Sequence, residues 1–199
     1  TQMDLLVCGN GWTTQNVSAM YKLLRPFEER LRISIWNRPV NDGMQQGLQS
    51  LYEHVRASVE MIPINGDDDI LAFLHDDLYV HEQGWDERVL KAFTDHPRVG
   101  LVGFGGATAV GGEEIYKDPY DFAQLGRRNF FSNMRGAEIH GTRTTEEMPI
   151  VFTDGFSLIV RRSLLDKING WAWLPPEMVA YGYDCGMACM AKRHGYEGW

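Results

Sequence analysis

The sequence is short of positive charge. Lysine and arginine together number 19 against 27 aspartates and glutamates, which gives a net charge of −8 and a pI of about 5.2. A surface of this sign, with no basic run, repels a phosphate backbone, so we expect no nucleic-acid partner. A smaller phosphate ligand would need a bridging cation, or local donors such as backbone N–H groups, to bind.

The sequence also lacks several motifs that define enzyme classes. It has no GxxxxGK[ST] segment, which excludes a P-loop, and neither GxSxG nor HExxH is present. Two glycine-rich stretches, "CGNGWTT" (8–14) and "VGFGGAT" (102–108), follow apolar runs but lack the third glycine of a dinucleotide-binding fingerprint. We interpret both as flexible loops.

Cysteines and long apolar runs are scarce. Cys8, Cys185 and Cys189 form no CxxC pair, which favours reduced thiols. Cys185 and Cys189 are one helical turn apart and are expected to face a core. No apolar run approaches the ~18 residues of a membrane span, and no basic segment precedes "DLLVC". We therefore expect a soluble, cytoplasmic protein without a membrane span.

The remaining pattern is an alternation of strands and helices. Strand-like runs at 4–8, 32–36, 70–74, 99–104 and 156–160 are separated by helical patterns, with a helix break expected at Pro26. This order predicts one α/β domain over 1–199, with a mostly parallel, Rossmann-like sheet and helices on both faces. Ligands are then expected beyond the carboxyl ends of the strands. The segment 105–148 has weak periodicity, which is typical of a functional loop or lid.

Two adjacent aspartates end one of these strands. In "LAFLHDDLYV" (71–80), Asp76 and Asp77 directly follow an apolar run. At about 4 Å and an effective dielectric near 20, their charges repel by roughly 4 kcal/mol. Mn²⁺ or Mg²⁺ would remove that repulsion and bridge the carboxylates to the phosphates of a ligand. On the pair alone, a solvated turn is an equally good interpretation.

The segments around this pair occur in a familiar order. "FLHDDLYV", "GWDERVLKAFTDHPRVGLVG", "TDGFSLIVRRSLLDKINGW" and "YGYDCGMACMAKRHGY" together resemble the family-2 glycosyltransferases of GT-A fold. The likeness extends over most of the chain and includes a DxD-type aspartate pair at the end of a central strand. It implies a metal-dependent hexosyltransferase that uses a nucleotide sugar.

The resemblance also implies roles for single residues. Asp77 would be a metal ligand, with Asp76 near the metal or the ribose. Asn37 takes the place of an aspartate that reads the nucleotide base in this family, and Trp173 would offer its ring to the sugar, although core packing explains it equally well. The donor-binding set is completed by Gly9, Asn10, Arg38, His75, Asp154 and Gly155.

Asp184 is the expected catalytic base. In inverting members a carboxylate takes the proton from the acceptor hydroxyl, and "YGYD" places Asp184 just before a predicted helix, whose free N–H groups favour an ionised carboxylate. A simple helix N-cap is the alternative. The family often has an acidic residue where this chain has Tyr183. If Asp184 is only a cap, Asp154 or Glu177 is the next candidate, or the mechanism is retaining.

The predicted function is transfer of a sugar from a UDP-sugar, or another nucleoside diphosphate sugar, to an acceptor hydroxyl on a carbohydrate or other molecule. The nucleotide-binding part would occupy about 1–104, and the acceptor or lid part about 105–199. A sugar nucleotidyltransferase is an alternative, although neither glycine-rich loop carries the lysine or arginine that binds a triphosphate. A non-catalytic carbohydrate-binding module is another, against which the alternation of strands and helices argues.

Overall fold

The computed structural model describes residues 4–38, 40–57, 69–109, 130–133, 142–175 and 182–199. The chain forms two compact units. Unit 1 comprises 1–64 and 170–181, and unit 2 comprises 65–169 and 182–199. Within the described ranges, no helix is both long and apolar enough to cross a membrane. The predicted division near residue 104, into nucleotide and acceptor parts, is functional and stays a prediction.

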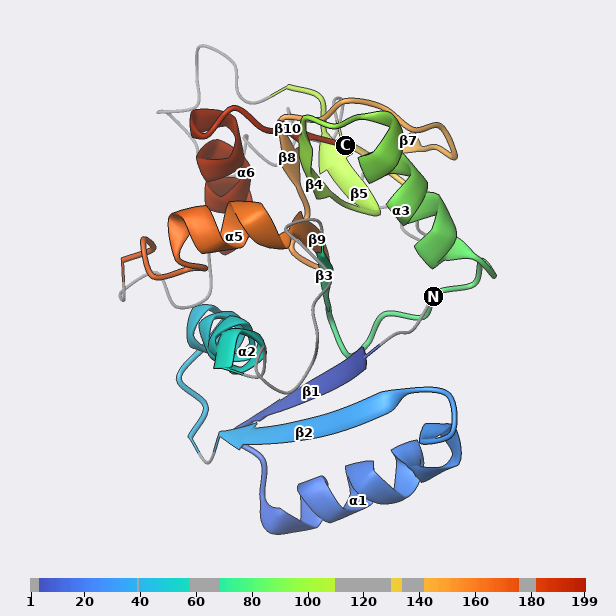
Figure 1. Ribbon diagram of the computed structural model, residues 1–199, viewed down its shortest axis with the longest axis vertical. Coiled ribbons are helices and arrows are strands. Elements are labelled where there is room, and N and C mark those ends of the chain that lie inside the picture. The colour runs from blue at the N-terminus through green and yellow to red at the C-terminus, as the bar shows by residue number, and fades with distance from the viewer. Residues whose placement is uncertain (1–3, 39, 58–68, 110–129, 134–141, 176–181) are drawn as a thin grey trace. The chain divides into compact units, whose positions relative to one another are not determined.

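Unit 1 is built on two parallel strands. β1 (Asp4–Asn10) pairs with β2 (Arg32–Arg38) along its whole length. The connection between them is α1 (Thr14–Leu24) followed by a 3-10 turn (Arg25–Phe27), so the helix ends before Pro26 as predicted. α2 (Met44–Ala57) follows β2. Figure 1 shows α1 running along β2 and α2 lying beside β1.

A later segment of the chain completes unit 1. The side-chain amide of Gln45, buried on α2, donates to the carbonyls of Trp171 (3.2 Å) and Leu174 (2.8 Å). The Trp171 N–H donates to Gln49 Oε1 at 2.6 Å, and the Trp171 side chain is fully buried. Two buried backbone carbonyls thus find their donor more than 120 residues away, which no local pattern predicts.

Unit 2 contains a mixed sheet, so the prediction of a mostly parallel sheet is wrong. The strand order is β10 (Glu197–Gly198), β4 (Val99–Val102), β9 (Ser157–Arg161) and β3 (Ile70–Leu74). β9 is antiparallel to both of its neighbours, whereas β10 and β4 are parallel to each other. Every residue of β9 is buried. A continuous apolar run shows that a strand is covered on both faces but carries no information on its direction.

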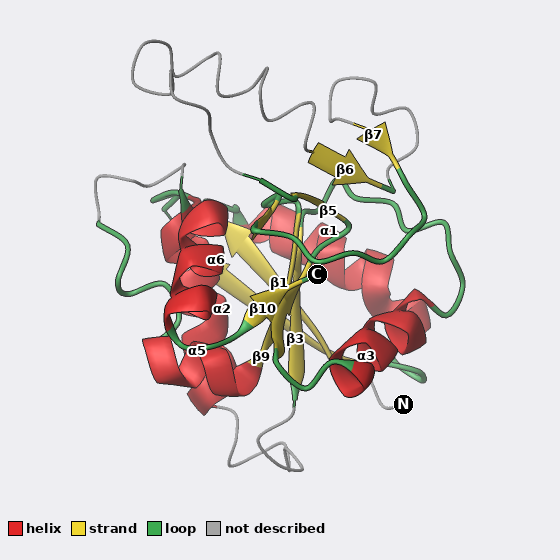
Figure 2. Cartoon of the chain, turned by 90° about the horizontal axis from the view of Figure 1, so that it is seen from above, coloured by secondary structure: helices red, strands yellow, loops and turns green. Residues whose placement is uncertain are grey.

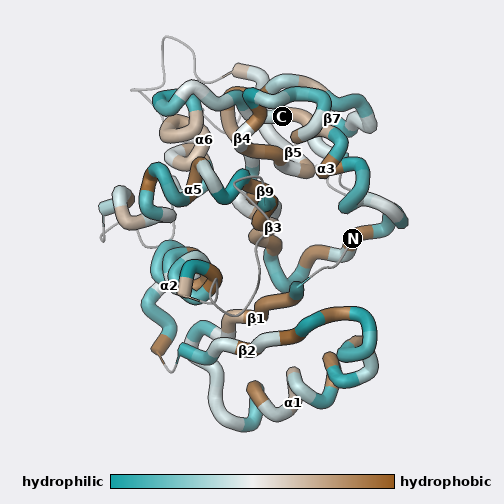
Figure 3. Tube along the Cα trace, in the orientation of Figure 1, coloured by the Kyte–Doolittle hydropathy of each residue, from teal (hydrophilic) through white to brown (hydrophobic). Residues whose placement is uncertain are grey.

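Among the described residues, three helices cover this sheet. α3 (Trp85–Asp95) lies on one face, and α5 (Arg162–Ile168) and α6 (Tyr183–Arg193) lie on the other (Figure 2). The expected helices on both faces are therefore confirmed for unit 2. The hydrophobic segments of unit 2 concentrate in β3, β4 and β9 (Figure 3). One core cluster joins α3, β4 and β9 and consists of Val89, Ala92, Phe93, Val99, Val102 and Ile159.

All three cysteines are free thiols. Cys8 and Cys185 are partly buried, but Cys189 is exposed, so the prediction that Cys189 faces the core is wrong. α6 buries Tyr183, Met187, Ala188 and Ala191 instead. These residues follow the spacing of three to four residues that defines a single helix face, and Cys189 lies outside that face.

Part of the segment predicted as an irregular loop forms a second sheet in unit 2. Its order is β7 (Thr142–Arg143), β6 (Phe130–Ser132), β5 (Gly105–Ala107) and β8 (Phe152–Thr153). β5 is fully buried, so the interpretation of "VGFGGAT" as a flexible loop is wrong. A Cβ on Gly106 would stand 2.5 Å from the Phe152 carbonyl oxygen, which explains the glycine by close strand packing. The rest of the predicted lid, 110–129 and 134–141, lies outside the described residues.

Gly170 offers a test of packing in unit 1. It has φ +63°, and a Cβ there would stand 2.5 Å from both Tyr52 Cδ1 and Gln49 Oε1. We expect Gly170→Ala to lower the free energy of unfolding through backbone strain and through overpacking, which alone costs about 1–3 kcal/mol. Gly195→Ala is the matched control, because Gly195 has φ +84° but no atom within 4 Å of the added Cβ. Equal losses for the two variants in urea unfolding would contradict the packing argument.

Candidate active site

The aspartate pair lies in a turn at the end of β3. Leu74 is the last residue of β3 and pairs with Ser157, the first residue of β9. The His75 N–H then donates to the Phe156 carbonyl at 3.1 Å, and the Leu78 N–H closes the turn on the His75 carbonyl at 3.3 Å. His75 is half-buried, whereas Asp76 and Asp77 are exposed. The turn that carries the two aspartates is therefore held by backbone hydrogen bonds, and both aspartates are exposed to solvent.

The "TDG" segment lies directly beside this turn. Asp154 follows β8, and its N–H donates to the Gly105 carbonyl at 2.9 Å, while its own carbonyl accepts from the Ser157 N–H at 3.3 Å. Gly155 is buried, and a Cβ there would stand 2.6 Å from Tyr183 Cζ. The glycine is thus required by the approach of a tyrosine ring from α6. Asp154 and Gly155 connect β8 to β9 next to His75.

The start of α6 supplies the third part of the cluster. The N-cap is Gly182 with φ 77°, and the helix begins at Tyr183, so Asp184 lies in the first turn and not at the N-cap as one interpretation had it. Asp184 Oδ1 accepts a hydrogen bond from the Cys185 N–H at 2.7 Å. That bond satisfies one of the free donors of the first turn and directs the carboxylate to the helix N-terminus, where the macrodipole favours negative charge.

Tyr183 joins α6 to the turn after β3. Its hydroxyl lies 3.4 Å from His75 Nε2, and the residue is 8% exposed. Burial, followed by the charges of Asp184, Asp154 and Cys185, raises the pKa of Tyr183 to about 12. Burial, followed by Asp184, likewise raises the pKa of the Cys185 thiol to about 12. Both groups are therefore neutral hydrogen-bonding partners at neutral pH.

Unit 2 therefore brings together four residues predicted for the site, namely His75, Asp154, Gly155 and Asp184, with Asp76 and Asp77 following His75. The sequence interpretation did not assign a role to Tyr183. Its one signal was its place directly before the predicted base, where the resemblance leads one to expect an acidic residue. The tyrosine is explained by its contacts with Gly155 and His75, which only the tertiary structure shows.

The carboxylates of this cluster are the candidate ligands of a divalent metal ion. No group of three or more His, Cys, Asp or Glu side chains converges as a metal cage in the described part of the chain. Mg²⁺ and Mn²⁺ bound to nucleotides need only one or two carboxylates, because phosphate oxygens and water supply their other ligands. The exposed oxygens of Asp76 and Asp77 fit that kind of site.

The other predicted residues belong to unit 1. The buried Gly9 at the end of β1 is covered by the Trp12 ring, since a Cβ there would stand 2.6 Å from Trp12 Cγ. The Asn10 amide donates to Asn41 Oδ1 (3.1 Å) and to the Gly43 carbonyl (3.0 Å), and its own Oδ1 is buried without a hydrogen-bond partner. Their contact with a nucleotide stays a prediction.

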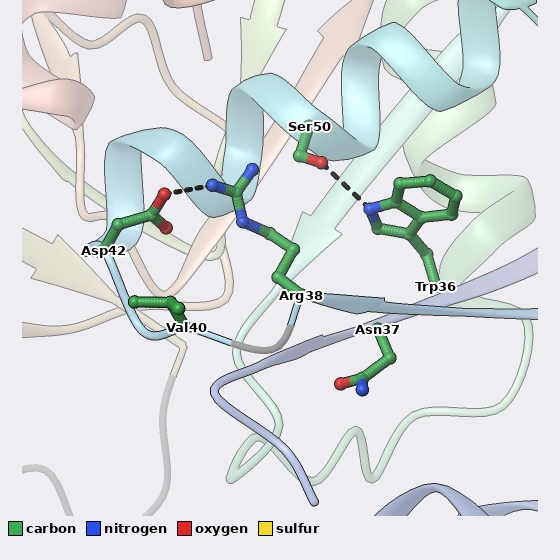
Figure 4. Close-up of a pocket in the computed structure, with 6 residues that line it drawn as sticks. All are labelled: Trp36, Asn37, Arg38, Val40, Asp42 and Ser50. Atoms are coloured by element: carbon green, nitrogen blue, oxygen red, sulfur yellow. Dashed lines mark hydrogen bonds and ion pairs between the residues drawn. The ribbon is translucent and has the colours of Figure 1, made fainter. Parts of the chain in front are cut away.

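Asn37 and Arg38 point to opposite sides of β2 (Figure 4). Arg38 turns toward α2, where it forms an ion pair with Asp42 and donates to the Gln46 carbonyl at 3.0 Å. Asn37 is exposed, and its amide donates to the Trp12 carbonyl at 3.3 Å. The alternation of side chains along a strand makes it impossible for both to face one ligand from the same side. The role of both residues in donor binding stays a prediction.

A small pocket lies beside Arg38 in unit 1. It has a volume of about 240 Å³ and is lined by Trp36, Asn37, Arg38, Val40, Asp42 and Ser50 (Figure 4). The Trp36 indole N–H donates to Ser50 Oγ at 3.0 Å, and its ring lies 5.1 Å from the His54 ring. Trp173, the predicted sugar platform, also belongs to unit 1. It is half-buried, and its indole N–H donates to the Gly170 carbonyl at 2.8 Å.

Comparison with known proteins gives one likeness, at the level of structure. No protein-family model matches the sequence, and no curated protein matches it either. The structure is similar to that of a mannosyltransferase from Pyrobaculum calidifontis, solved in complex with GDP-mannose and Mn²⁺, with a TM-score of 0.59 and 14% sequence identity. The likeness covers 98% of this chain but only 44% of that one. At this identity it shows the fold alone: this chain has an α/β fold similar to that of a glycosyltransferase.

Proposed function

We propose that this chain is a divalent-metal-dependent glycosyltransferase of GT-A type, which moves a sugar from a nucleoside diphosphate donor to an acceptor hydroxyl. One observation carries the proposal. Within unit 2, the turn with Asp76 and Asp77, the Asp154–Gly155 segment and the first turn of α6 with Asp184 are in contact through His75, Phe156 and Tyr183. The glycosyltransferase-like fold supports the same reading of these carboxylates.

The proposed chemistry divides between two groups of carboxylates. Asp76 and Asp77 form the DxD-type pair and would hold Mn²⁺ or Mg²⁺. The ion supplies positive charge to the donor's diphosphate, which is the leaving group. Asp184 takes the proton from the acceptor hydroxyl as that oxygen attacks the anomeric carbon, which inverts the configuration. Its neighbours Tyr183 and Cys185 are both neutral, so neither places a positive charge beside Asp184.

Unit 1 is assigned to nucleotide recognition. Because the Asn37 amide nitrogen donates to the Trp12 carbonyl, Asn37 Oδ1 can accept a hydrogen bond from the nucleotide base. Uracil presents a single ring N–H on the edge that such an oxygen would read. Guanine presents a ring N–H and an amino group there. The family resemblance of the sequence favours a UDP-sugar, whereas the mannosyltransferase of similar fold was solved with GDP-mannose, so both nucleotides belong in the test.

A screen of nucleotide sugars tests the proposal. We expect Mn²⁺-dependent release of a nucleoside diphosphate from one donor class, UDP- or GDP-linked, with loss of activity in chelator and an inverted anomeric configuration of the product. Formation of a nucleotide sugar from a sugar phosphate and a nucleoside triphosphate would instead identify a nucleotidyltransferase. Sugar binding that needs neither nucleotide nor metal, with no turnover, would identify a binding module.

A further inference from the structure

The contact between Tyr183 and His75 joins two parts of unit 2 that are 108 residues apart in the chain. His75 is fixed from the other side by its backbone N–H, which donates to the Phe156 carbonyl. Tyr183 is fixed because its ring packs against the bare Cα of Gly155. The Tyr183 hydroxyl and the His75 imidazole therefore belong to residues that are each held in place by a second contact.

The contact between Tyr183 and His75 lies next to the carboxylates of the candidate site. His75 is followed directly by Asp76 and Asp77, and Tyr183 is followed directly by Asp184. The neutral phenol can donate to the imidazole or accept from it, so the contact forms with either histidine tautomer. The rate of sugar transfer depends strongly on the distance between the catalytic base and the bound sugar donor.

We propose that Tyr183 is a positioning residue, which holds the first turn of α6 and the His75–Asp77 turn at a fixed separation through its hydroxyl contact with His75. This inference rests on the proposed glycosyltransferase function. Tyr183 does not itself touch the reacting atoms. It sets where Asp184 stands relative to the carboxylates that bind the donor complex.

Tyr183→Phe is the direct test, because it removes the hydroxyl and keeps the ring on Gly155. We expect kcat to fall about tenfold, while the affinity for the nucleoside diphosphate with Mn²⁺ stays within about twofold, since Asp76 and Asp77 are unchanged. Tyr196→Phe is the matched control. Tyr196 is also in unit 2, and its hydroxyl lies 3.3 Å from Ser163 Oγ. We expect its loss to leave kcat within about twofold.

A double-mutant cycle shows whether the effect runs through His75. We expect His75→Gln to lower kcat by about as much as Tyr183→Phe, and the double variant to lose no more than about twofold beyond the larger single loss. If the two losses multiply, the residues act independently and the inference is overturned. Should Tyr183→Phe be too unstable to assay, His75→Gln, which leaves the tyrosine ring in place, must by itself show the selective loss of kcat.

A spectroscopic readout separates this inference from the proposed function. In nitrogen-15 NMR, the His75 ring signals should shift in Tyr183→Phe and not in Tyr196→Phe. Unchanged His75 signals would overturn the contact even in an active enzyme. If the wild-type protein shows no metal-dependent sugar transfer, the proposed function is wrong. The His75 ring signals would still show whether the contact with Tyr183 exists.

Discussion

Asp184→Asn is expected to lower kcat for sugar transfer by about 10²–10⁴-fold, the range that general-base catalysis usually contributes. Asparagine retains the side-chain oxygen that accepts from the Cys185 N–H, so the first turn of α6 keeps its hydrogen bond. Only the charge and the ability to take a proton are lost. Donor affinity should therefore stay near the wild-type value, and the loss should appear in kcat.

α3 provides a matched control for this variant. It also begins after a left-handed glycine, Gly84 with φ 76°, and also has an aromatic residue and then an aspartate in its first turn, Trp85 and Asp86. Asp86→Asn makes the same change at the same helix position, away from the candidate site. It should cost similar stability through the helix dipole and leave turnover unchanged. If Asp184→Asn keeps transfer within about threefold of wild type, Asp184 only stabilises the helix. The next candidate bases are then Asp154 and Glu177, of which Glu177 lies outside the described residues, or the mechanism is a retaining one.

Asp77→Ala is expected to abolish the metal-dependent binding of nucleotide. For the wild-type protein, a nucleoside diphosphate at about 100 times its Kd, with Mn²⁺ present, should stabilise the native state by about 2.7 kcal/mol. For a chain of this size that corresponds to a rise in Tm of about 5–10 °C. The Tm shift does not depend on turnover, so it tests the carboxylate pair even if no acceptor is known.

Two controls accompany the Asp77 measurement. Asp95→Ala removes an exposed carboxylate from the end of α3, where it pairs with Lys91, and should keep the full Tm shift. The wild-type protein in chelator should show none. A shift of equal size in chelator would mean that the nucleotide binds without a metal bridge, and that "HDD" is the solvated turn that the sequence equally allowed.

The candidate site was predictable from the sequence where it depends on strand ends. His75, Asp76 and Asp77 follow an apolar run that forms β3, and Asp154 precedes the run that forms β9. The carboxyl end of β3 meets the start of β9, so an antiparallel pairing still brings these residues together. The wrong direction assigned to β9 therefore did not displace the predicted residues. Tyr183 was missed because its role exists only through residues distant in the chain.

The sequence by itself determined the local elements of this protein, because a helix or a strand repeats its burial pattern within a few residues, as α2, α3, β3 and β9 do. Only the tertiary structure decided the direction of β9, the packing of β5 against β8, the return of Trp171 to α2 and the approach of Tyr183 to Gly155 and His75. Each of these depends on which surfaces fit together, and a fit between segments that are 28 to 129 residues apart in the chain leaves no periodic pattern in either segment.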